Sequence, residues 1–162
     1  MPVNYAPFQI ILHWLVAVLV LAQYLNDSAI GRVFRAAMRG APEPSGTAAM
    51  AHVVVGVAIL ALALARIALR LTHGAPPAPA EEPRILRAVA AATHGVLYLL
   101  LLLLPLSGLV AWYGGIRAAA EAHEFLKTLL LLAVVLHVAG ALYQQFVLRS
   151  GVVARMLRPA RR

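Results

Sequence analysis

Apolar residues along the chain fall into four long segments, separated by shorter stretches that are rich in charged residues, glycine and proline. Each segment is close to the about 20 residues that an α-helix needs to cross a lipid bilayer. The predicted spans run from about Phe8 to Leu25, Thr47 to Leu71, Ala88 to Tyr113 and His123 to Leu148. The pattern therefore predicts an all-α integral membrane protein, in which residues 1–162 form a single domain folded as an up-and-down bundle of four helices.

Composition supports a membrane protein and narrows its chemistry. Of the 162 residues, 62% are hydrophobic and 12% are charged, whereas a soluble domain carries about 25% charged residues. The absence of cysteine excludes disulfides, thiolate-bound iron–sulfur clusters and covalently attached c-type haem. No Lys or Arg precedes the first apolar segment and no cleavage site follows it promptly. We therefore expect this segment to be retained as a helix.

Basic residues at the ends of the spans account for the net charge of +8, so we expect a lipid bilayer and no nucleic acid as the partner. Nine basic residues lie on one side of the predicted spans: Arg66, Arg70, Arg84, Arg87, Arg149, Arg155, Arg158, Arg161 and Arg162. Five lie on the other side: Arg32, Arg35, Arg39, Arg117 and Lys127. Because cytoplasmic loops carry the excess of Lys and Arg, both termini are predicted to be cytoplasmic.

Every predicted span carries at least one histidine, a residue that is rare inside membranes and marks a candidate functional site there. His123 and His137 are fourteen residues apart on the fourth span. On a helix they point about 40° apart and lie about 21 Å apart along the axis. Given the predicted orientation, His52 and His123 share an outer depth. An inner layer is formed by His13, His94 and His137.

Histidines at two depths on facing helices are typical of haem ligands. Two neutral imidazoles are a natural axial pair for a haem iron, and helix bundles commonly bind cofactors between facing helices. The two layers predict two haem b groups, the outer one held by His52 and His123 and the inner one by two of the three inner histidines. Two axial ligands leave the iron no open position, so we expect electron transfer rather than oxygen binding.

Three other interpretations compete with haem ligation. The histidines could form hydrogen bonds between helices, bind zinc, or act as proton relays in a haem-free transporter or assembly factor. The sequence has no H-x-x-x-H or H-E-x-x-H motif and no carboxylate deep in any span. These absences disfavour both zinc and the proton relay.

Two arginines at the end of the second span are candidates for binding the haem propionates. Arg66 follows His52 by fourteen residues and Arg70 follows it by eighteen, so both point near the direction of His52 on a helix. Arginine is the preferred bidentate partner of carboxylates. Snorkelling to the membrane interface is the alternative, above all for Arg70. Gly56 and Gly140 remove side chains where a flat macrocycle could approach.

Motifs on all four spans carry a family resemblance. They are Ile11-Leu-His13-Trp14, His52, Arg66-Ile-Ala-Leu-Arg70, His94-Gly-Val-Leu-Tyr-Leu-Leu, Pro105-Leu-Ser-Gly108, and His123-Glu124 through His137 to Arg155-Met-Leu-Arg. With these motifs the chain resembles the bacterial cytochrome b561 family of four-helix di-haem membrane proteins, including the superoxide:quinone oxidoreductases. It is also similar to the cytochrome b subunits of membrane formate dehydrogenases and nickel hydrogenases. The resemblance covers nearly the whole chain.

The resemblance implies which histidines pair. It assigns His13 and His137 to the inner haem, and His52 and His123 to the outer haem. His94 is then left over, either as a proton-handling contact for a quinone or as a hydrogen-bond partner of a haem propionate or a neighbouring carbonyl. The implied function is that of a cytochrome in the bacterial inner membrane, which carries electrons between an outer-side donor and the quinone pool.

Two candidates compete as the outer-side donor. Superoxide would make the chain a superoxide:quinone oxidoreductase, and the five outer basic residues could attract this anion. Superoxide-oxidising relatives, however, have a longer segment between the third and fourth spans than the residues 114–122 of this chain. The alternative is a periplasmic redox protein, for which the chain would be the electron-transfer subunit.

Overall fold

The computed structural model describes residues 4–26, 31–33, 36, 47–79 and 82–158. Its elements are α1 (Pro7–Leu25), α3 (Thr47–His73), α4 (Arg84–Gly114), α5 (Arg117–Phe146) and the short α6 (Val152–Arg155). No strand occurs in these described ranges. The predicted all-α fold is confirmed, and four helices are long and apolar enough to cross a membrane.

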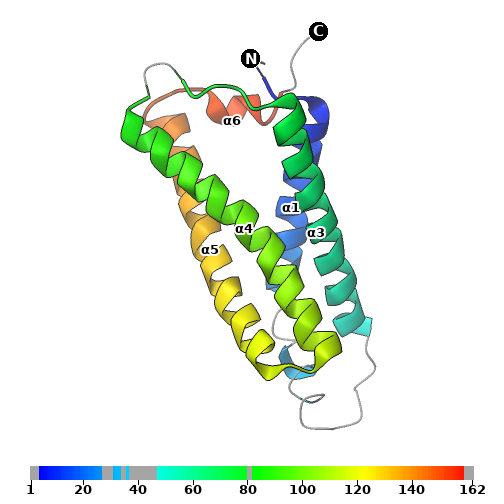
Figure 1. The fold of residues 1–162 in the computed structure, drawn as a ribbon. Coiled ribbons are helices and arrows are strands. Elements are labelled where there is room, and N and C mark those ends of the chain that lie inside the picture. The colour runs from blue at the N-terminus through cyan, green and yellow to red at the C-terminus, as the bar shows by residue number, and fades with distance from the viewer. Residues whose placement is uncertain (1–3, 27–30, 34–35, 37–46, 80–81, 159–162) are drawn as a thin grey trace.

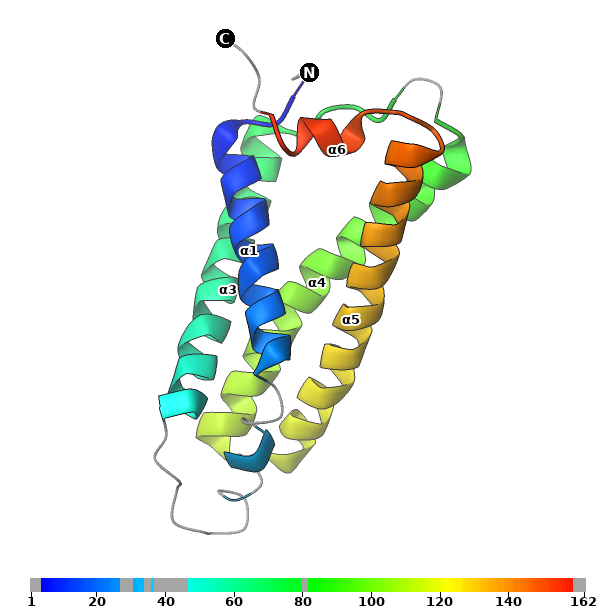
Figure 2. The ribbon, with the colours of Figure 1, turned by 180° about the vertical axis from the view of Figure 1, so that it is seen from behind.

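The four long helices run alternately up and down in one bundle (Figure 1). α1 packs on α3, α3 packs on α4, and α4 packs on α5. By contrast, within the described residues no Cα atom of α5 lies within 8 Å of a Cα atom of α1 or α3. We call the end where α1 begins and α6 lies the termini end, and the end with the α4–α5 turn the far end (Figures 1 and 2).

Most large apolar side chains point outward from the bundle, and only a small set is buried. Leu132, for example, is 60% exposed, whereas Leu130 on the same helix is 2% exposed. The buried cluster comprises Val16, Ile59, Ala63, Leu100, Leu101, Leu130 and Ala133. A helix that is apolar on all sides suits a lipid environment, because hydrocarbon chains solvate the outward side chains that water would not.

The connection between α4 and α5 is shorter than the sequence suggested. Gly115 caps α4 in the left-handed conformation with φ of 62°, and α5 begins at Arg117, six residues before the predicted span. The residues after Arg117 are three alanines and Glu121, which favour helix strongly. Arg117 and Glu121 also form an ion pair of 3.0 Å one turn apart. The helix therefore extends beyond the apolar segment that defined the span.

The termini end is covered by segments that the sequence did not predict to be ordered. α6 follows Gly151, whose φ is 70°, and lies across this end of the bundle (Figure 2). Trp14 Nε1 of α1 donates a hydrogen bond to the Met156 carbonyl at 2.9 Å. An Arg155 guanidinium nitrogen donates to the Pro77 carbonyl at 3.0 Å. These bonds attach the C-terminal segment to α1 and to the stretch that follows α3.

Candidate cofactor site

Three histidines from three different helices meet at the termini end. His13 of α1 and His137 of α5 have ring centroids 6.1 Å apart, with 67° between the ring planes. His94 of α4 lies closer to His137, at 5.0 Å between centroids and 82° between planes. All three side chains are half-buried. The structure therefore brings together the three residues that the sequence assigned to the inner layer.

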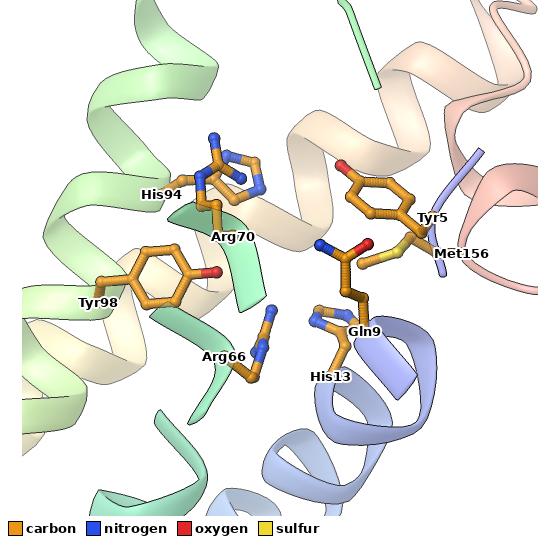
Figure 3. A pocket seen from close by; sticks show the side chains of 8 residues that line it. All are labelled: Tyr5, Gln9, His13, Arg66, Arg70, His94, Tyr98 and Met156. Atoms are coloured by element: carbon orange, nitrogen blue, oxygen red, sulfur yellow. The ribbon is translucent and has the colours of Figure 1, made fainter. Parts of the chain in front are cut away.

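A pocket opens beside this histidine cluster (Figure 3). Its lining comprises Tyr5, Gln9, His13, Arg66, Arg70, His94, Tyr98 and Met156. In this view Arg66 lies between Tyr98 and His13, and Arg70 and His94 both line the pocket. The Arg66 guanidinium carbon is 5.6 Å from the centroid of the Tyr98 ring, within the range of a cation–π interaction. None of the described residues that line the pocket is acidic, so the pocket is suited to an anionic group.

The two predicted propionate-binding arginines therefore line the same pocket as two of the inner histidines. Their exposure differs, because Arg66 is half-buried and Arg70 is exposed. A guanidinium that is partly withdrawn from water has the stronger electrostatic interaction with an anion, since the local dielectric constant is lower. Arg66 is thus the better placed of the two to bind a carboxylate in the pocket.

Hydrogen bonds distinguish the histidines at the termini end. His94 Nδ1 lies 2.7 Å from the carbonyl oxygen of Ala90 on its own helix. A carbonyl oxygen can only accept, so Nδ1 carries the hydrogen and Nε2 is left with a lone pair in the neutral ring. His13 Nδ1, in contrast, is buried and has no hydrogen-bond partner among the described residues. Such a nitrogen is costly to bury unless another group satisfies it.

The second pair of histidines lies at the far end. His52 of α3 and His123 of α5 have ring centroids 6.1 Å apart, with 72° between the ring planes. Two residues of α1 fix the surrounding backbone. Gln23 Nε2 donates to the His52 carbonyl at 2.9 Å, and the Tyr24 hydroxyl donates to the Lys127 carbonyl at 2.5 Å. The sequence-predicted outer pair is thus brought together, and α1 is tied to both helices that supply it.

His123 also contacts α4, through residues that the sequence reasoning did not single out as a site. Its Nδ1 donates a hydrogen bond to the Leu104 carbonyl at 2.9 Å, and Ser107 Oγ donates to the same carbonyl at 2.8 Å. The imidazole also lies directly against Gly108. The available signal was the stretch Pro105-Leu-Ser-Gly108, which contributed only to the family resemblance.

The glycines named from the sequence are less constrained. A Cβ atom at Gly56 would be 3.8 Å from Gln23 Nε2, an ordinary contact, and a Cβ atom at Gly140 would meet nothing within 4 Å in the described residues. A sixth histidine, His73, ends α3 and is exposed, with Nδ1 2.8 Å from Thr72 Oγ1. His73 belongs to neither histidine pair.

The separation of the two pairs fits imidazoles on opposite sides of one metal ion. A metal–imidazole bond is about 2 Å long and the ring centre lies about 1 Å farther, so the two ring centres are expected about 6 Å apart. Both the His13–His137 and the His52–His123 centroid distances are 6.1 Å. The helices that supply each pair, α1 with α5 and α3 with α5, also lack close backbone contact. The residues present therefore fit two bis-histidine haem sites.

Two of the basic residues assigned to the far end are paired with carboxylates. Arg117 pairs with Glu121 at 3.0 Å, and Lys127 pairs with Glu124 at 2.6 Å. These pairs reduce the local positive field that could attract an anion. Of the other basic residues assigned to this side, Arg32 is described, whereas Arg35 and Arg39 lie outside the described residues. On the opposite side, Arg161 and Arg162 also lie outside them.

Comparison with known proteins identifies the family of the chain. The family model for prokaryotic cytochrome b561 matches residues 4–159. Cytochrome b562 of Cereibacter sphaeroides is 39% identical over 159 residues, which cover 96% of each chain. A protein named probable superoxide oxidase CybB, from Yersinia pestis, is 27% identical over 178 residues, covering 95% of this chain and 96% of the relative.

The resemblance inferred from the sequence motifs is confirmed by this match, which spans nearly the whole chain. Membership also agrees with the four apolar helices, since the family consists of membrane proteins that carry electrons by means of haem b. The chain belongs to the prokaryotic cytochrome b561 family: it is a b-type cytochrome that spans the membrane several times and functions in electron transfer.

Proposed function

We propose that the chain binds two haem b groups and transfers electrons between an outer-side donor and the quinone pool. The observation that carries this proposal is the presence of two histidine pairs with the same 6.1 Å centroid separation, one at each end of the bundle. His123 and His137 are both on α5, about 21 Å apart along the helix. One helix thus supplies a ligand at each end, and α1 and α3 supply the partners.

The geometry favours His13 over His94 as the partner of His137. The His94 and His137 ring centroids are 5.0 Å apart, about 1 Å less than two imidazoles need to share a metal ion between them. His13 and His137 meet the required separation. If Nε2 of His13 binds the metal, the buried Nδ1 of the same ring needs a hydrogen-bond partner of its own, such as an ordered water.

Haem b, when bound, supplies a one-electron redox couple whose potential depends on the axial ligands, their hydrogen bonds and burial. The chain contributes the ligands and the surrounding charge. At the termini end, Arg66 and Arg70 would bind propionates, with Arg66 making the stronger contribution because it is half-buried. His13 with His137 and His52 with His123 would hold the two haems, and ligation by two histidines would suit electron transfer rather than oxygen binding.

His94 is the candidate contact for quinone in the same pocket. Its Nδ1–H is bonded to the Ala90 carbonyl, so the neutral ring offers Nε2 as a hydrogen-bond acceptor. An acceptor is suited to take a proton from a hydroquinone hydroxyl, and a protonated His94 is suited to return one to a reduced quinone. A contact between Nε2 and a propionate would require His94 to be protonated, because both groups are otherwise acceptors.

The donor side supports two versions of the function. Superoxide is supported by similarity to a relative named as a probable superoxide oxidase. A periplasmic redox protein is supported by two features of the far end: the ion-paired Arg117 and Lys127, and the two-residue connection between α4 and α5. A haem-free transporter or assembly factor is disfavoured, because the chain belongs to a family of cytochromes.

The predicted orientation completes the proposal. The family resemblance supports the bacterial inner membrane as the location. We place the termini end in the cytoplasm, because nine of the fourteen basic residues of the chain lie on that side. The termini-end pocket would then exchange protons with the cytoplasm. The far-end pair His52 and His123 would face the periplasmic donor.

Absorption spectroscopy and haem quantification of the purified protein in detergent test the proposal. We expect reducible b-type bands and two haems per chain. His52→Ala and His123→Ala should remove the same haem, whereas His13→Ala and His137→Ala should remove the other. His73→Ala is the matched control, because His73 lies in neither pair and should retain both haems.

Two results would contradict the assignment. Loss of a haem in His94→Ala, with both haems retained in His13→Ala, would make His94 the axial ligand at the termini end. One haem per wild-type chain would leave one histidine pair without the proposed role. The donor is tested separately, by measuring superoxide-driven quinone reduction in liposomes. Turnover favours superoxide, and its absence favours a protein donor.

A further inference from the structure

The imidazole of His123 lies against α4 at a position where a side chain would collide with it. A Cβ atom added at Gly108 would lie 3.0 Å from both Cε1 and Nδ1 of the His123 ring. This is closer than an ordinary van der Waals contact, so one of the two groups would have to move. Gly95 on the same helix is different, because a Cβ atom there would meet no described residue within 4 Å. Gly108 therefore provides space for one particular ring.

The same stretch of α4 controls the hydrogen bonding of that ring. His123 Nδ1 is 2.9 Å from the Leu104 carbonyl oxygen, which can only accept. The hydrogen of the neutral ring is therefore on Nδ1, and the lone pair is on Nε2. Ser107 Oγ donates to this same carbonyl at 2.8 Å and lies 3.4 Å from His123 Nδ1. The Leu104 oxygen thus has two donors, one from the histidine and one from the serine.

We propose that Leu104, Ser107 and Gly108 form a cradle that positions His123 and sets the redox potential at the far end. This inference rests on the proposed function, because it takes His123 to be an axial ligand. Gly108 allows the ring to approach α4, and the Leu104 carbonyl fixes Nε2 as the metal-binding nitrogen. Ser107 is a positioning residue that shares the acceptor with His123.

The cradle predicts the direction in which the potential changes. A hydrogen bond from ligand Nδ1–H to a carbonyl makes the imidazole a stronger electron donor, which stabilises the oxidised metal and lowers the potential. Because Ser107 competes for the Leu104 oxygen, removing its hydroxyl strengthens the remaining bond from His123. Ser107→Ala should therefore lower the far-end midpoint potential. Gly108→Ala should displace the ring and alter the angle between the two imidazole planes, which is 72° here.

The test uses the haem-loaded protein in detergent, with three variants. Haem content, the midpoint potentials and the lowest-field g value in electron paramagnetic resonance are measured for Gly108→Ala, Ser107→Ala and the control Gly95→Ala. The far-end signal is identified as the one that His52→Ala removes. We expect Gly108→Ala to lose or shift only that signal, Ser107→Ala to lower only that potential, and Gly95→Ala to leave the far-end signal unchanged.

Other outcomes contradict either the cradle or the proposed ligand pair. The cradle proposal is overturned if the far-end g value and midpoint potential are those of the wild type in both Gly108→Ala and Ser107→Ala. It is also overturned if Gly95→Ala shifts the far-end g value as much as Gly108→Ala does. If Gly108→Ala does not fold, Ser107→Ala decides, since it adds no atoms, and an unchanged or raised far-end potential overturns the proposal. Retention of both haems in His52→Ala would instead refute the ligand pair, and so the proposed function on which the cradle rests.

Discussion

Replacing Arg66 with methionine removes a half-buried guanidinium and keeps a long apolar side chain in its place. Arg66 lines the pocket together with His13 and His94. In the proposed function it bonds a haem propionate, and a hydrogen bond to a charged group contributes about 1.5–3 kcal/mol. Since 1.4 kcal/mol is a factor of ten in Kd, we expect Arg66→Met to weaken haem binding at the termini end by about 10- to 150-fold.

The assay is haem transfer from the purified protein to an excess of a competing apoprotein, followed by absorbance. Arg70→Met is the matched control, because Arg70 lines the same pocket but is exposed. Exposed ion pairs contribute about 1 kcal/mol or less, so its effect should be below about fivefold. A redox titration should also show a lower termini-end potential in Arg66→Met, because a nearby positive charge disfavours the oxidised iron. Wild-type affinity and potential in Arg66→Met would refute the propionate role.

Two further predictions concern the bundle itself. Leu130→Ala removes a side chain that is 2% exposed, and the cavity should lower the free energy of unfolding by about 2 kcal/mol. This value is near the low end for core leucines, because an apolar lipid or detergent environment offsets the transfer term. Leu132→Ala, at a 60% exposed position, should leave thermal unfolding in detergent nearly unchanged. Tyr24→Phe removes the hydrogen bond to the Lys127 carbonyl and should cost about 1 kcal/mol in the same assay. Equal melting temperatures for both leucine variants, or for Tyr24→Phe and wild type, would contradict these assignments of contacts.

The sequence was sufficient to predict the four long helices and which histidines lie at the same end of the bundle. Helical periodicity and rise depend only on local geometry, so the fourteen-residue interval between His123 and His137 places them on one side of α5 at opposite ends. Arg66 could likewise be placed at the depth of the inner layer, and the structure has it lining the pocket beside His13. These inferences needed no knowledge of how the helices pack.

Contacts between helices could not be predicted in this way. Periodicity gives the direction of a side chain on its own helix, but not the rotation of that helix against its neighbours. The sequence therefore left three candidates for the inner pair, and the distances among His13, His94 and His137 depend on packing. The approach of His123 to Gly108 depends on it as well. The sequence did not predict α6 for another reason: a helix of four residues is too short to give a periodic pattern of apolar positions.

The pairing order of the helices has a consequence for assembly. α1 packs on α3, and α4 packs on α5 through a two-residue turn, so the bundle consists of two helical hairpins joined where α3 meets α4. In the proposed ligation each haem takes one histidine from the first hairpin and one from the second. Neither hairpin alone completes a ligand pair, and haem acts as a cross-link between them. A ligand that binds only the joined state stabilises that state. Haem binding would therefore strengthen the association of the two halves, which already share the buried cluster, and the hairpins should separate more readily in the haem-free protein than in the haem-loaded protein.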